Sequence, residues 1–451
     1  MTRTFRYVAL LGVATAMLAV SIHGQARRVE FTDTRLPNGL RVIISEDHSA
    51  PVFSIAVNYF VGSRDERKGR TGFAHLFEHM MFKGSENVGT GEHFYLVFTN
   101  GGDMNGTTNK DRTLYFERLP TNQLELGLFL EADRMRSLAI TAANLDNQRN
   151  AVQEERRLGI DNQPYGKTFE TVDELAYENF ANAHSVIGSM DDLTAATVDD
   201  VAAFFKTYYA PNNAVLAIVG AVDTTHALAR IRHHFESIPT QPPPPRPNLD
   251  EPAQTAERRT TIDDALARLP RVDMAWCTPP SLTPDHDALT VLANVLASGR
   301  SSRFFEAIVR QAQLASNVSA FAGDSRGPGL FRVIGAAVPN KAIADLEAAI
   351  HAEIERIKTG AIEGWEIEKA RNNARRSIVQ QLGSSLQRAV LLSQYALLND
   401  DPDLINTRAD RLSAVTAEDV QRVARQYLTA ENRTVVITQP KAAAAPAKGD
   451  Q

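Results

Sequence analysis

The sequence is poor in cysteine, with Cys277 as the one cysteine among 451 residues. A single thiol cannot close an internal disulfide, and it cannot supply an iron–sulfur site or a cysteine-based zinc knuckle. Any metal site must therefore be built mainly from histidine and carboxylate side chains. The lack of disulfides also fits an exported protein of the bacterial periplasm better than a disulfide-stapled eukaryotic secreted protein.

The chain also lacks an excess of positive charge. It has 48 Lys and Arg residues against 54 Asp and Glu residues, a formal net charge of −6. Nucleic-acid-binding domains are usually basic or carry a basic stripe, so this balance argues against that class. Hydrophobic residues make up 43% of the chain and glycine shows no period, which excludes a disordered or collagen-like protein. No Gly-x-Ser-x-Gly elbow and no nucleotide-binding loop occur.

Long hydrophobic runs are absent beyond the N-terminal segment, so we expect no stable membrane span. Arg3 and Arg6 precede 16 residues without formal charge, a run shorter than the roughly 20 residues of a membrane helix. Gly24 and Ala26 supply small residues at −3 and −1. We therefore expect residues 1–26 to be a signal peptide cleaved after Ala26, and the protein to be periplasmic or secreted. An uncleaved anchor is the alternative.

Proline is concentrated in one stretch, because residues 239–252 hold seven of the 21 prolines. Such a run behaves as a stiff spacer. We expect an N-terminal domain at 27–238, a linker at 239–252, a C-terminal domain at 253–439 and a disordered tail at 440–451.

The two halves resemble each other at a constant offset of 219 residues. At least seven positions coincide between 193–219 and 412–438, among them Thr197/Thr416 and Asp200/Asp419. Each Thr-x-x-Asp predicts a helix start, and a β-branched strand follows each helix. The sequence thus predicts an α+β fold of two homologous domains, each an antiparallel sheet with helices packed on one face.

The first half shows the clearest secondary-structure patterns. Asn38-Gly39 is a hairpin signal, and the other segments follow from their hydrophobic periodicity. We expect strands at 31–35, 40–45, 52–59 and 112–117, and helices at 72–82, 124–135 and 144–158.

The segment that carries chemistry is His75-Leu76-Phe77-Glu78-His79. The two histidines are four residues apart and lie one turn apart on one helix face, where two neutral imidazoles can share one Zn²⁺. Glu78 falls in the same sector and can take a proton from a water that zinc activates. His-x-x-Glu-His is the inverzincin signature. The apolar neighbours favour a metal site, because a metal would compensate the desolvation of these polar groups.

A catalytic zinc needs a third protein ligand. The helix expected at 144–158 offers Glu154 and Glu155, which point about 100° apart, so both cannot face one metal. His-x-x-Glu-His with Glu155 lying 76 residues after His79 resembles the pitrilysin/insulinase family of zinc metallopeptidases, which includes the mitochondrial processing peptidase. Their third ligand ends an Arg-x-x-(apolar)-x-x-Glu stretch, which residues 149–155 match. The resemblance therefore implies Glu155 as the third ligand.

The resemblance extends over nearly the whole chain. It implies a zinc-dependent metalloendopeptidase with one Zn²⁺ per chain, held by His75, His79 and Glu155, and with Glu78 as the catalytic base. Further segments that match the family are 64–66, 72–75, 101–107, 162–166, 186–189 and 209–213.

Residues 101–107 resemble the family's substrate-binding edge, which takes up peptide backbone as an added strand. This implies substrate-binding roles for Asn105 and Gly106, although Asn105 can also be a simple turn residue. In the second half, Arg310 resembles an arginine that grips the substrate. Two departures stand out. Ser316 occupies the place where the family has a tyrosine, and Gln148 the place where many members have a supporting glutamate.

Half-length members of the family pair as two chains that form a clamshell. The resemblance therefore implies a peptide substrate and a second half-length chain, either in a homodimer or in a heterodimer with an Arg/Tyr-bearing paralogue. A different class of function is a non-catalytic or assembly subunit of the same fold. That alternative predicts a broken zinc motif, whereas the motif here is complete.

Overall fold

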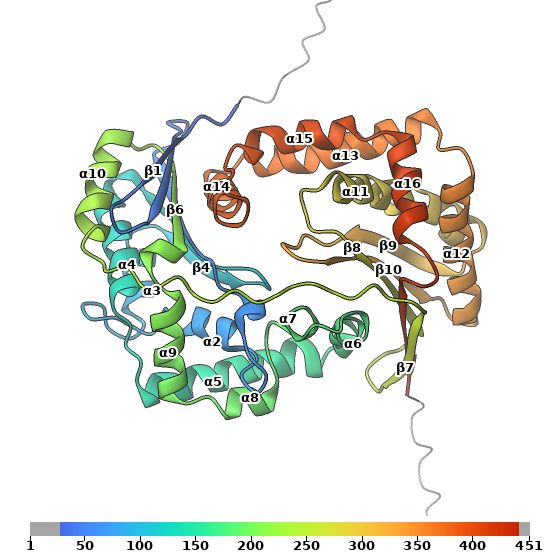
Figure 1. The fold of residues 1–451 in the computed structure, drawn as a ribbon, viewed down its shortest axis with the longest axis horizontal. Helices are drawn as coiled ribbons and strands as arrows, with labels where there is room; N and C mark the ends of the chain where they lie inside the picture. The colour runs from blue at the N-terminus through green and yellow to red at the C-terminus, as the bar shows by residue number, and fades with distance from the viewer. Residues whose placement is uncertain (1–27, 442–451) are drawn as a thin grey trace, which may run out of the picture.

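The computed structural model describes residues 28–441 (Figure 1). The signal peptide expected at 1–26 and most of the expected tail lie outside these residues. Two β-sheets, one from each half of the chain, stand side by side with helices around them, and the connection between the halves crosses the middle of the molecule. None of the helices within 28–441 is both long and apolar enough to cross a bilayer.

The first sheet has the strand order β1-β2-β6-β3-β5-β4, and the second has the order β7-β11-β8-β10-β9. Both are mainly antiparallel, and each contains one parallel pair, β2 with β6 and β11 with β7. Strands β4 and β9 are edge strands. The bounds are β1 (Thr32–Arg35), β2 (Arg41–Glu46), β3 (Val52–Tyr59), β4 (Asp103–Thr108), β5 (Thr113–Pro120), β6 (Ala214–Gly220), β7 (Arg258–Asp264), β8 (Arg271–Thr278), β9 (Ala315–Ala322), β10 (Gly329–Ala337) and β11 (Arg433–Pro440).

Helices surround both sheets. Those of the first half are η1 (Ser63–Asp65), α2 (Phe73–Met80), α3 (Glu92–Thr99), η2 (Thr121–Gln123), α4 (Leu124–Arg136), α5 (Ala142–Arg156), η3 (Arg157–Asp161), α6 (Gly166–Ala176), α7 (Phe180–Ala183), α8 (Met190–Thr194), α9 (Val198–Tyr208), η4 (Pro211–Asn213) and α10 (Thr224–Phe235). Those of the second half are α11 (Pro284–Ala297), η5 (Phe305–Gln311), α12 (Ile343–Thr359), α13 (Gly364–Gln381), α14 (Ser385–Asn399), α15 (Leu404–Ala414) and α16 (Ala417–Tyr427).

The α+β fold with two related halves is confirmed. Strand β3, helix α6, helix α9 and strand β6 each begin 219 residues before β8, α14, α16 and β11. The repeated Thr-x-x-Asp motif caps a helix in both copies, since Thr197 accepts from the Asp200 amide and Thr416 accepts from the Asp419 amide. Local sequence therefore sets the same helix start twice.

The two halves exchange one helix each, which differs from the expectation of helices on one face only. Helix α14 packs on β3 and β6 of the first sheet, and α6 packs on β8 and β11 of the second (Figure 1). All seven residues of β6 are buried, so helices must cover both faces of the sheet at this strand. A strand with one solvated face would alternate between polar and apolar residues.

The expected elements of the first half lie close to the observed ones. Strand β3 has the expected bounds, and α2 occupies most of the expected helix at 72–82. Gly39 has a φ of +89° in the turn between β1 and β2, and a Cβ there would lie 2.7 Å from the Cβ of Asn212. The Asn-Gly hairpin is therefore confirmed, with glycine supplying both the turn and the close approach.

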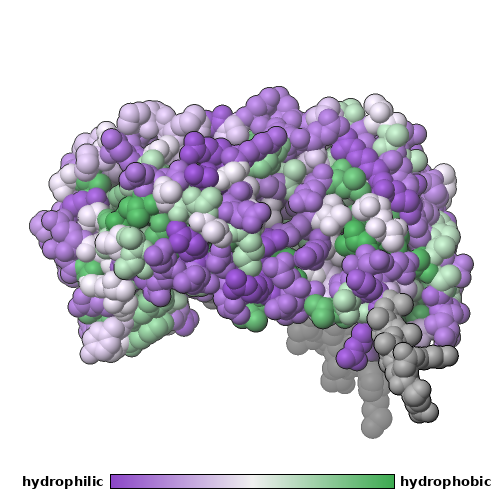
Figure 2. Space-filling model, turned by 90° about the horizontal axis from the view of Figure 1, so that it is seen from below, coloured by the Kyte–Doolittle hydropathy of each residue, from purple (hydrophilic) through white to green (hydrophobic). Residues whose placement is uncertain are grey.

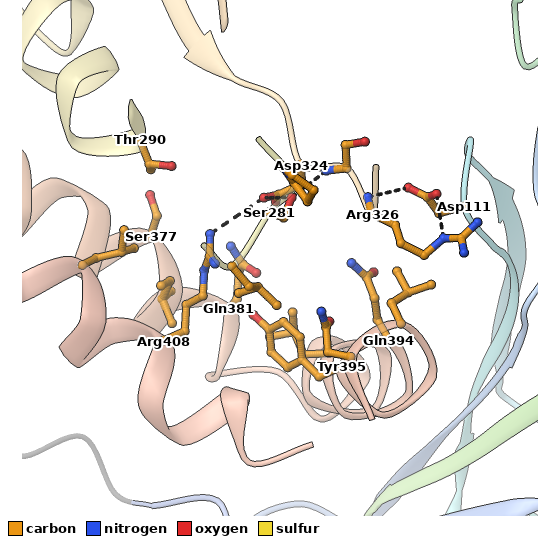
Figure 3. A pocket seen from close by; sticks show the side chains of 18 of the residues that line it. Asp111, Ser281, Thr290, Asp324, Arg326, Ser377, Gln381, Gln394, Tyr395 and Arg408 are labelled. Carbon is orange, nitrogen blue, oxygen red and sulfur yellow. Dashed lines mark hydrogen bonds and ion pairs between the residues drawn. The ribbon is translucent and has the colours of Figure 1, made fainter. Parts of the chain in front are cut away.

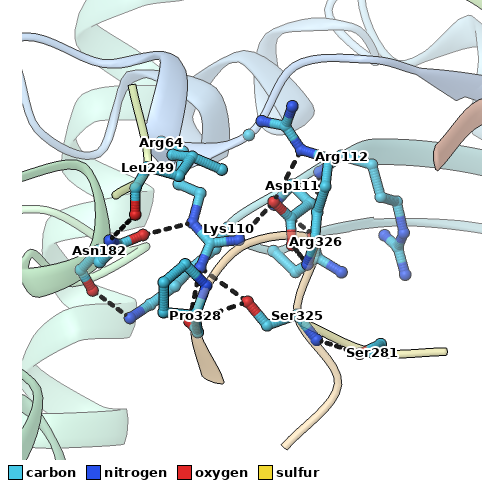
Figure 4. A network of polar contacts seen from close by, with 12 residues as sticks. Arg64, Lys110, Asp111, Arg112, Asn182, Leu249, Ser281, Ser325, Arg326 and Pro328 are labelled. Carbon is cyan, nitrogen blue, oxygen red and sulfur yellow. Dashed lines mark hydrogen bonds and ion pairs between the residues drawn. The ribbon is translucent and has the colours of Figure 1, made fainter. Parts of the chain in front are cut away.

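A buried polar network joins the two halves near the start of β5 (Figure 4). The guanidinium of Arg64 donates to Asp111 Oδ1 at 2.5 Å and to Ser325 Oγ of the second half at 2.8 Å. Asp111 Oδ2 also accepts from the backbone N–H of Arg326 at 3.0 Å. Arg64 and Asp111 are both buried. The turn that leads out of edge strand β4 is therefore tied to the second half.

The proline-rich connection has no helix or strand between the end of α10 and the start of β7. It nevertheless packs against the first half. The guanidinium of Arg246 lies 3.8 Å from the ring centroid of Phe60, and Asn182 Nδ2 donates to the carbonyl of Leu249 at 3.0 Å.

Candidate metal centre

The centre is built on α2, whose start is held by a buried carboxylate. Glu66 accepts from the backbone N–H groups of Gly72 at 2.9 Å and Ala74 at 2.8 Å, and its Oε2 lies 3.0 Å from His184 Nε2. Carboxylates at a helix N-terminus satisfy free amide groups and complement the helix dipole. These contacts fix the position of α2, whose buried side chains are Phe73, Ala74, Leu76, Phe77 and Met80.

The structure brings His75, His79 and Glu155 together. Glu155 Oε2 on α5 lies 3.6 Å from His75 Nε2 and 3.3 Å from His79 Nε2. One ligand atom from each of the three residues lies within 4.8 Å of the other two. Glu154 points elsewhere and pairs with Arg157 at 3.0 Å. Two imidazoles and one carboxylate are a donor set typical of catalytic zinc.

The protonation states of the histidines suit metal binding. Burial, reinforced by the neighbouring His79, lowers the pKa of His75 to about 4. Burial also lowers the pKa of His79, although Glu155 and the amide of Gln148 act in the opposite direction. Metal ligation requires the neutral imidazole, which is thus the form present near neutral pH.

Glu78 lies on the same helix and contacts edge strand β4. Its Oε2 accepts from Thr108 Oγ1 at 2.6 Å. Burial raises the pKa of Glu78 to about 6, with Thr108 opposing that shift. A carboxylate whose pKa is raised toward neutrality is suited to accept and return a proton.

Because Gly106 has no side chain, the side chain of Glu78 can pack closely against strand β4. A Cβ at position 106 would lie 2.8 Å from Glu78 Cγ. The N–H of Gly106 donates to Asn105 Oδ1 at 2.9 Å, and β4 is the last strand of its sheet within the described residues. An added strand could pair with this edge.

Arg310 is not brought to the centre. It lies on η5 in the second half, 64% exposed, and pairs with Glu306 one turn earlier. Within residues 28–441, no ion pair joins it to His75, His79 or Glu155. Ser316 lies on edge strand β9.

Three residues that support the centre escaped the sequence reasoning. Glu66 lies in a segment that matches the family, but nothing in the sequence showed that it caps α2. His184, 118 residues from Glu66, carries no local signal. Thr108 directly follows the matched segment 101–107 and touches Glu78 only because β4 runs beside α2.

A separate hollow of about 500 Å³ lies between the two halves (Figure 3). It is lined mainly by α11, α13, α14 and α15, and Arg326 on its wall contacts Asp111 of the first half. In the part of the chain that the structure describes, its lining includes no predicted site residue.

Comparison with known proteins places the chain in a family. Residues 41–189 match the family model "Insulinase (Peptidase family M16)", and residues 195–374 match "Peptidase M16 inactive domain". The metal centre lies within the first match. The chain is 30% identical to the zinc protease PqqE of Helicobacter pylori over 438 residues, which cover 96% of this chain and 98% of that protein.

Solved structures agree with this assignment. A Helicobacter pylori protease with 30% identity superposes with a TM-score of 0.87 and covers 91% of this chain and all of that one. The periplasmic protease PqqL of Escherichia coli, with 20% identity, has the same fold at a TM-score of 0.75. There the similarity covers 94% of this chain but 50% of that chain. The protein is a half-length member of the M16 (insulinase) family of zinc proteases.

Proposed function

We propose that the protein is a zinc-dependent metalloendopeptidase that cleaves peptides or unfolded polypeptide segments. The observation that carries this proposal is the convergence of His75, His79 and Glu155, with Glu78 held beside them against an edge strand. We also propose the division into domains at 27–238 and 253–439, with the catalytic machinery in the first.

The chain's own residues suggest the course of the reaction. His75, His79 and Glu155 would hold one Zn²⁺, which lowers the pKa of a water molecule and polarises the peptide carbonyl. A substrate paired with the free edge of β4 would pass Gly106 and Asn105. Glu78 would accept the proton from the attacking water at a carboxylate oxygen and return it to the leaving amine. Thr108 would orient Glu78 for both transfers.

Three variants test this function. The purified protein should contain about one zinc per chain, and Glu78→Gln should keep the metal while peptide cleavage falls by about 10²–10⁴-fold. Glu155→Gln should lose zinc, and the neighbouring Glu154→Gln should keep it. Full cleavage by Glu78→Gln would contradict the mechanism, and zinc loss in Glu154→Gln alone would identify a different third ligand.

We further propose that the protein is exported and works with a second half-length chain. The periplasmic PqqL fold, which continues for as long again beyond the region of similarity, supports this proposal. The family model described as inactive covers only residues from 195 onward. A non-catalytic role would be supported by a purified protein that binds zinc in no preparation and cleaves no peptide.

A further inference from the structure

The hollow of about 500 Å³ between the two halves plays no part in the proposed chemistry (Figure 3). We call it the central hollow. Helices α11, α13, α14 and α15 line most of it, and two loops of the second half and the turn between β4 and β5 complete its wall. Its volume falls within the range of about 300–1,000 Å³ that is typical of small-molecule sites. The central hollow is therefore large enough to hold a ligand of its own.

The outer surface of the molecule is a less specific place for binding. Figure 2 shows one face, which is mainly hydrophilic, with apolar residues in small groups. Small groups of this kind are normal on soluble proteins and do not mark a docking surface. A concave site on which polar groups converge is the stronger candidate for a specific ligand.

The charged side chains of the central hollow are already paired. Its lining holds two carboxylates, Asp111 and Asp324, and two guanidinium groups, Arg326 and Arg408. Arg326 Nε lies 3.3 Å from Asp111 Oδ1, and Arg408 Nη2 lies 3.8 Å from Asp324 Oδ1. The four charges of the lining therefore cancel, and an ionic ligand would bring a charge that the lining does not compensate. This balance favours a neutral ligand.

The other polar side chains of the lining are amides and hydroxyls. Gln394 and Tyr395 of α14 lie on one side of the central hollow, and Ser281 and Asp324 of two loops lie on the opposite side (Figure 3). Among the lining residues drawn in Figure 3, none forms a hydrogen bond with the side chain of Gln381, Gln394 or Tyr395. Burial raises the pKa of the Tyr395 phenol, which therefore keeps its proton and can donate. Amides and hydroxyls can both donate and accept, so these side chains suit a ligand that carries both kinds of group.

Apolar side chains form the rest of the wall. They include Leu282, Ile378, Leu391, Leu398 and Leu412. Leu282 has a φ of +63°, a left-handed conformation that is uncommon for a bulky residue. Its carbonyl accepts from Arg411 at 2.5 Å, which helps to hold this conformation. A wall fixed in this way is formed before a ligand arrives, and such preorganisation lowers the entropic cost of binding.

We propose that the central hollow binds a neutral sugar, up to the size of a disaccharide, between α13, α14 and the loops at 280–282 and 324–326. Each sugar hydroxyl both donates and accepts hydrogen bonds, which matches the amides of Gln381 and Gln394 and the phenol of Tyr395. The C–H face of a sugar ring is apolar and matches the leucine side chains of the wall. The proposal is independent of the proposed function, because within residues 28–441 the lining holds none of the metal-centre residues.

A sugar in this position would also join the two halves. Arg326 on the wall shares Asp111 with Arg64, in the buried network of Figure 4. Asp111 lies in the turn that follows edge strand β4, and α14 on the other side of the hollow covers the first sheet. Binding should therefore restrain both the loop at 324–326 and the turn at 109–111.

The first experiment measures sugar binding by isothermal titration calorimetry. Maltose, sucrose, lactose and trehalose are titrated into the wild-type protein, and at least one of them should bind at a single site. Tyr395→Phe/Gln394→Leu should weaken that binding by about tenfold or more, because polar groups of the bound sugar lose their partners. Gln387→Leu is the matched control and should bind the sugar as the wild type does, since Gln387 is exposed on the same helix and lies outside the hollow. Both variants should keep a wild-type circular dichroism spectrum.

Two results would overturn the proposal. One is that none of the four sugars binds at concentrations up to about 50 mM, which exceed millimolar dissociation constants. The other is equal sugar binding by the wild type and by Tyr395→Phe/Gln394→Leu, which would place the sugar elsewhere. Citrate and an end-blocked tripeptide are titrated in parallel. If either binds more tightly than every sugar and loses affinity in the double variant, the hollow takes an anion or a peptide, and the proposed ligand class is wrong.

A second experiment follows amide hydrogen exchange of the wild-type protein with and without the tightest-binding of the four sugars. Amides at 280–282, 324–326 and 109–111 should exchange more slowly in the sugar-bound protein, whereas those of α10, which lies outside the hollow, should be unchanged. Slower exchange confined to other segments would overturn the proposed location. Glu155→Gln, which should lose zinc, should bind the sugar with wild-type affinity, so a failure of the proposed function would leave the sugar site standing.

Discussion

The hydroxyl of Thr108 donates a 2.6 Å hydrogen bond to Glu78 Oε2, which joins the edge strand β4 to the helix that carries both histidines. The contact spans 30 residues of sequence. It places the proposed catalytic base against the strand with which a substrate would pair. Strand, base and metal ligands therefore form one unit.

Removing this hydrogen bond should impair cleavage but not metal binding. Thr108→Val keeps the shape of the side chain and deletes the donor. Hydrogen bonds to charged groups contribute about 1.5–3 kcal/mol, so kcat should fall by about 10–100-fold. Zinc content, measured by elemental analysis, should stay at the wild-type level. Thr108→Ser is the control and should retain most of the activity. Equal kcat in the valine and serine variants would show that the bond does not position Glu78.

The buried network around Asp111 should contribute more to stability than an exposed Asp–Arg pair does. Asp111 is buried, and Arg64 and Arg326 both donate to it. Breaking a buried pair leaves an uncompensated charge, so Asp111→Ala should lower the free energy of unfolding by about 3–5 kcal/mol.

The pair of Asp103 with Arg118 is the control, because both side chains are about half exposed. Asp103→Ala should cost about 1 kcal/mol or less. Urea unfolding followed by circular dichroism measures both variants. Equal losses would show that the network does not tie the halves together.

The local parts of the fold and site could be predicted from the sequence. The Thr-x-x-Asp caps, the Asn38-Gly39 turn and the four-residue spacing of His75 and His79 depend on neighbours in the chain. Their structural consequences follow from helix and turn geometry alone. Choosing between Glu154 and Glu155 needed the family resemblance, and the structure places Glu155 beside the histidines.

The long-range parts could not be predicted. The cover of the first sheet by α14 depends on contacts between residues more than 300 positions apart, such as Ser54 with Ser385. All seven residues of β6 are buried, so both faces of the strand are covered, whereas the sequence had led us to expect helices on one face only. Likewise, Glu66 and His184 meet only after α7 has packed beside η1.

A buried cluster behind α3 should make stability depend on pH. Glu117 Oε1 lies 2.7 Å from His93 Nε2, and Glu131 pairs with Arg134. Because the guanidinium of Arg134 already places a positive charge in this cluster, the cluster is not expected to bind a second metal ion. Burial raises the pKa of Glu117 and of Glu131 to about 7.

The direction in which stability changes with pH follows from the protons that the folded and unfolded states bind. The unfolded carboxyl loses its proton near pH 4.5, whereas the folded one keeps it up to about pH 7. Between these values the folded state binds more protons, so stability falls as pH rises. Glu117→Gln removes one such group. The stability of this variant relative to wild type should therefore improve by about 1–3 kcal/mol between pH 5 and pH 8.

Glu125 on α4 is the control for this titration. Its hydrogen bond with Arg230 lowers the pKa of Glu125 to about 2. Glu125→Gln should therefore change stability equally at pH 5 and pH 8, since Glu125 is ionised at both. Denaturant unfolding at the two pH values measures the differences. A pH-independent effect of Glu117→Gln would mean that Glu117 is ionised throughout.

Gln148 offers a way to strengthen the metal centre. It is 5% exposed, on α5, seven residues before Glu155, and its amide acts on His79. Gln148→Glu would place a negative charge beside one ligand. Without zinc, that charge is buried and unpaired, so the apo form should lose stability. With zinc, the charge is compensated, and zinc affinity should rise by about tenfold, at the lower end of the range seen for groups that support metal ligands.

Gln148→Glu should thus lower the stability of the apo form and raise zinc affinity, and observing both would show that the new charge acts on the metal ligand. The rise in melting temperature on adding zinc should be larger for Gln148→Glu than for wild type, and a competing chelator should remove the metal more slowly. Gln153→Glu on the same helix is the control, because that side chain contacts Thr194 rather than His79. If both variants respond to zinc as the wild type does, then Gln148 does not support His79. If both gain affinity equally, then general electrostatics and not the contact with His79 is responsible.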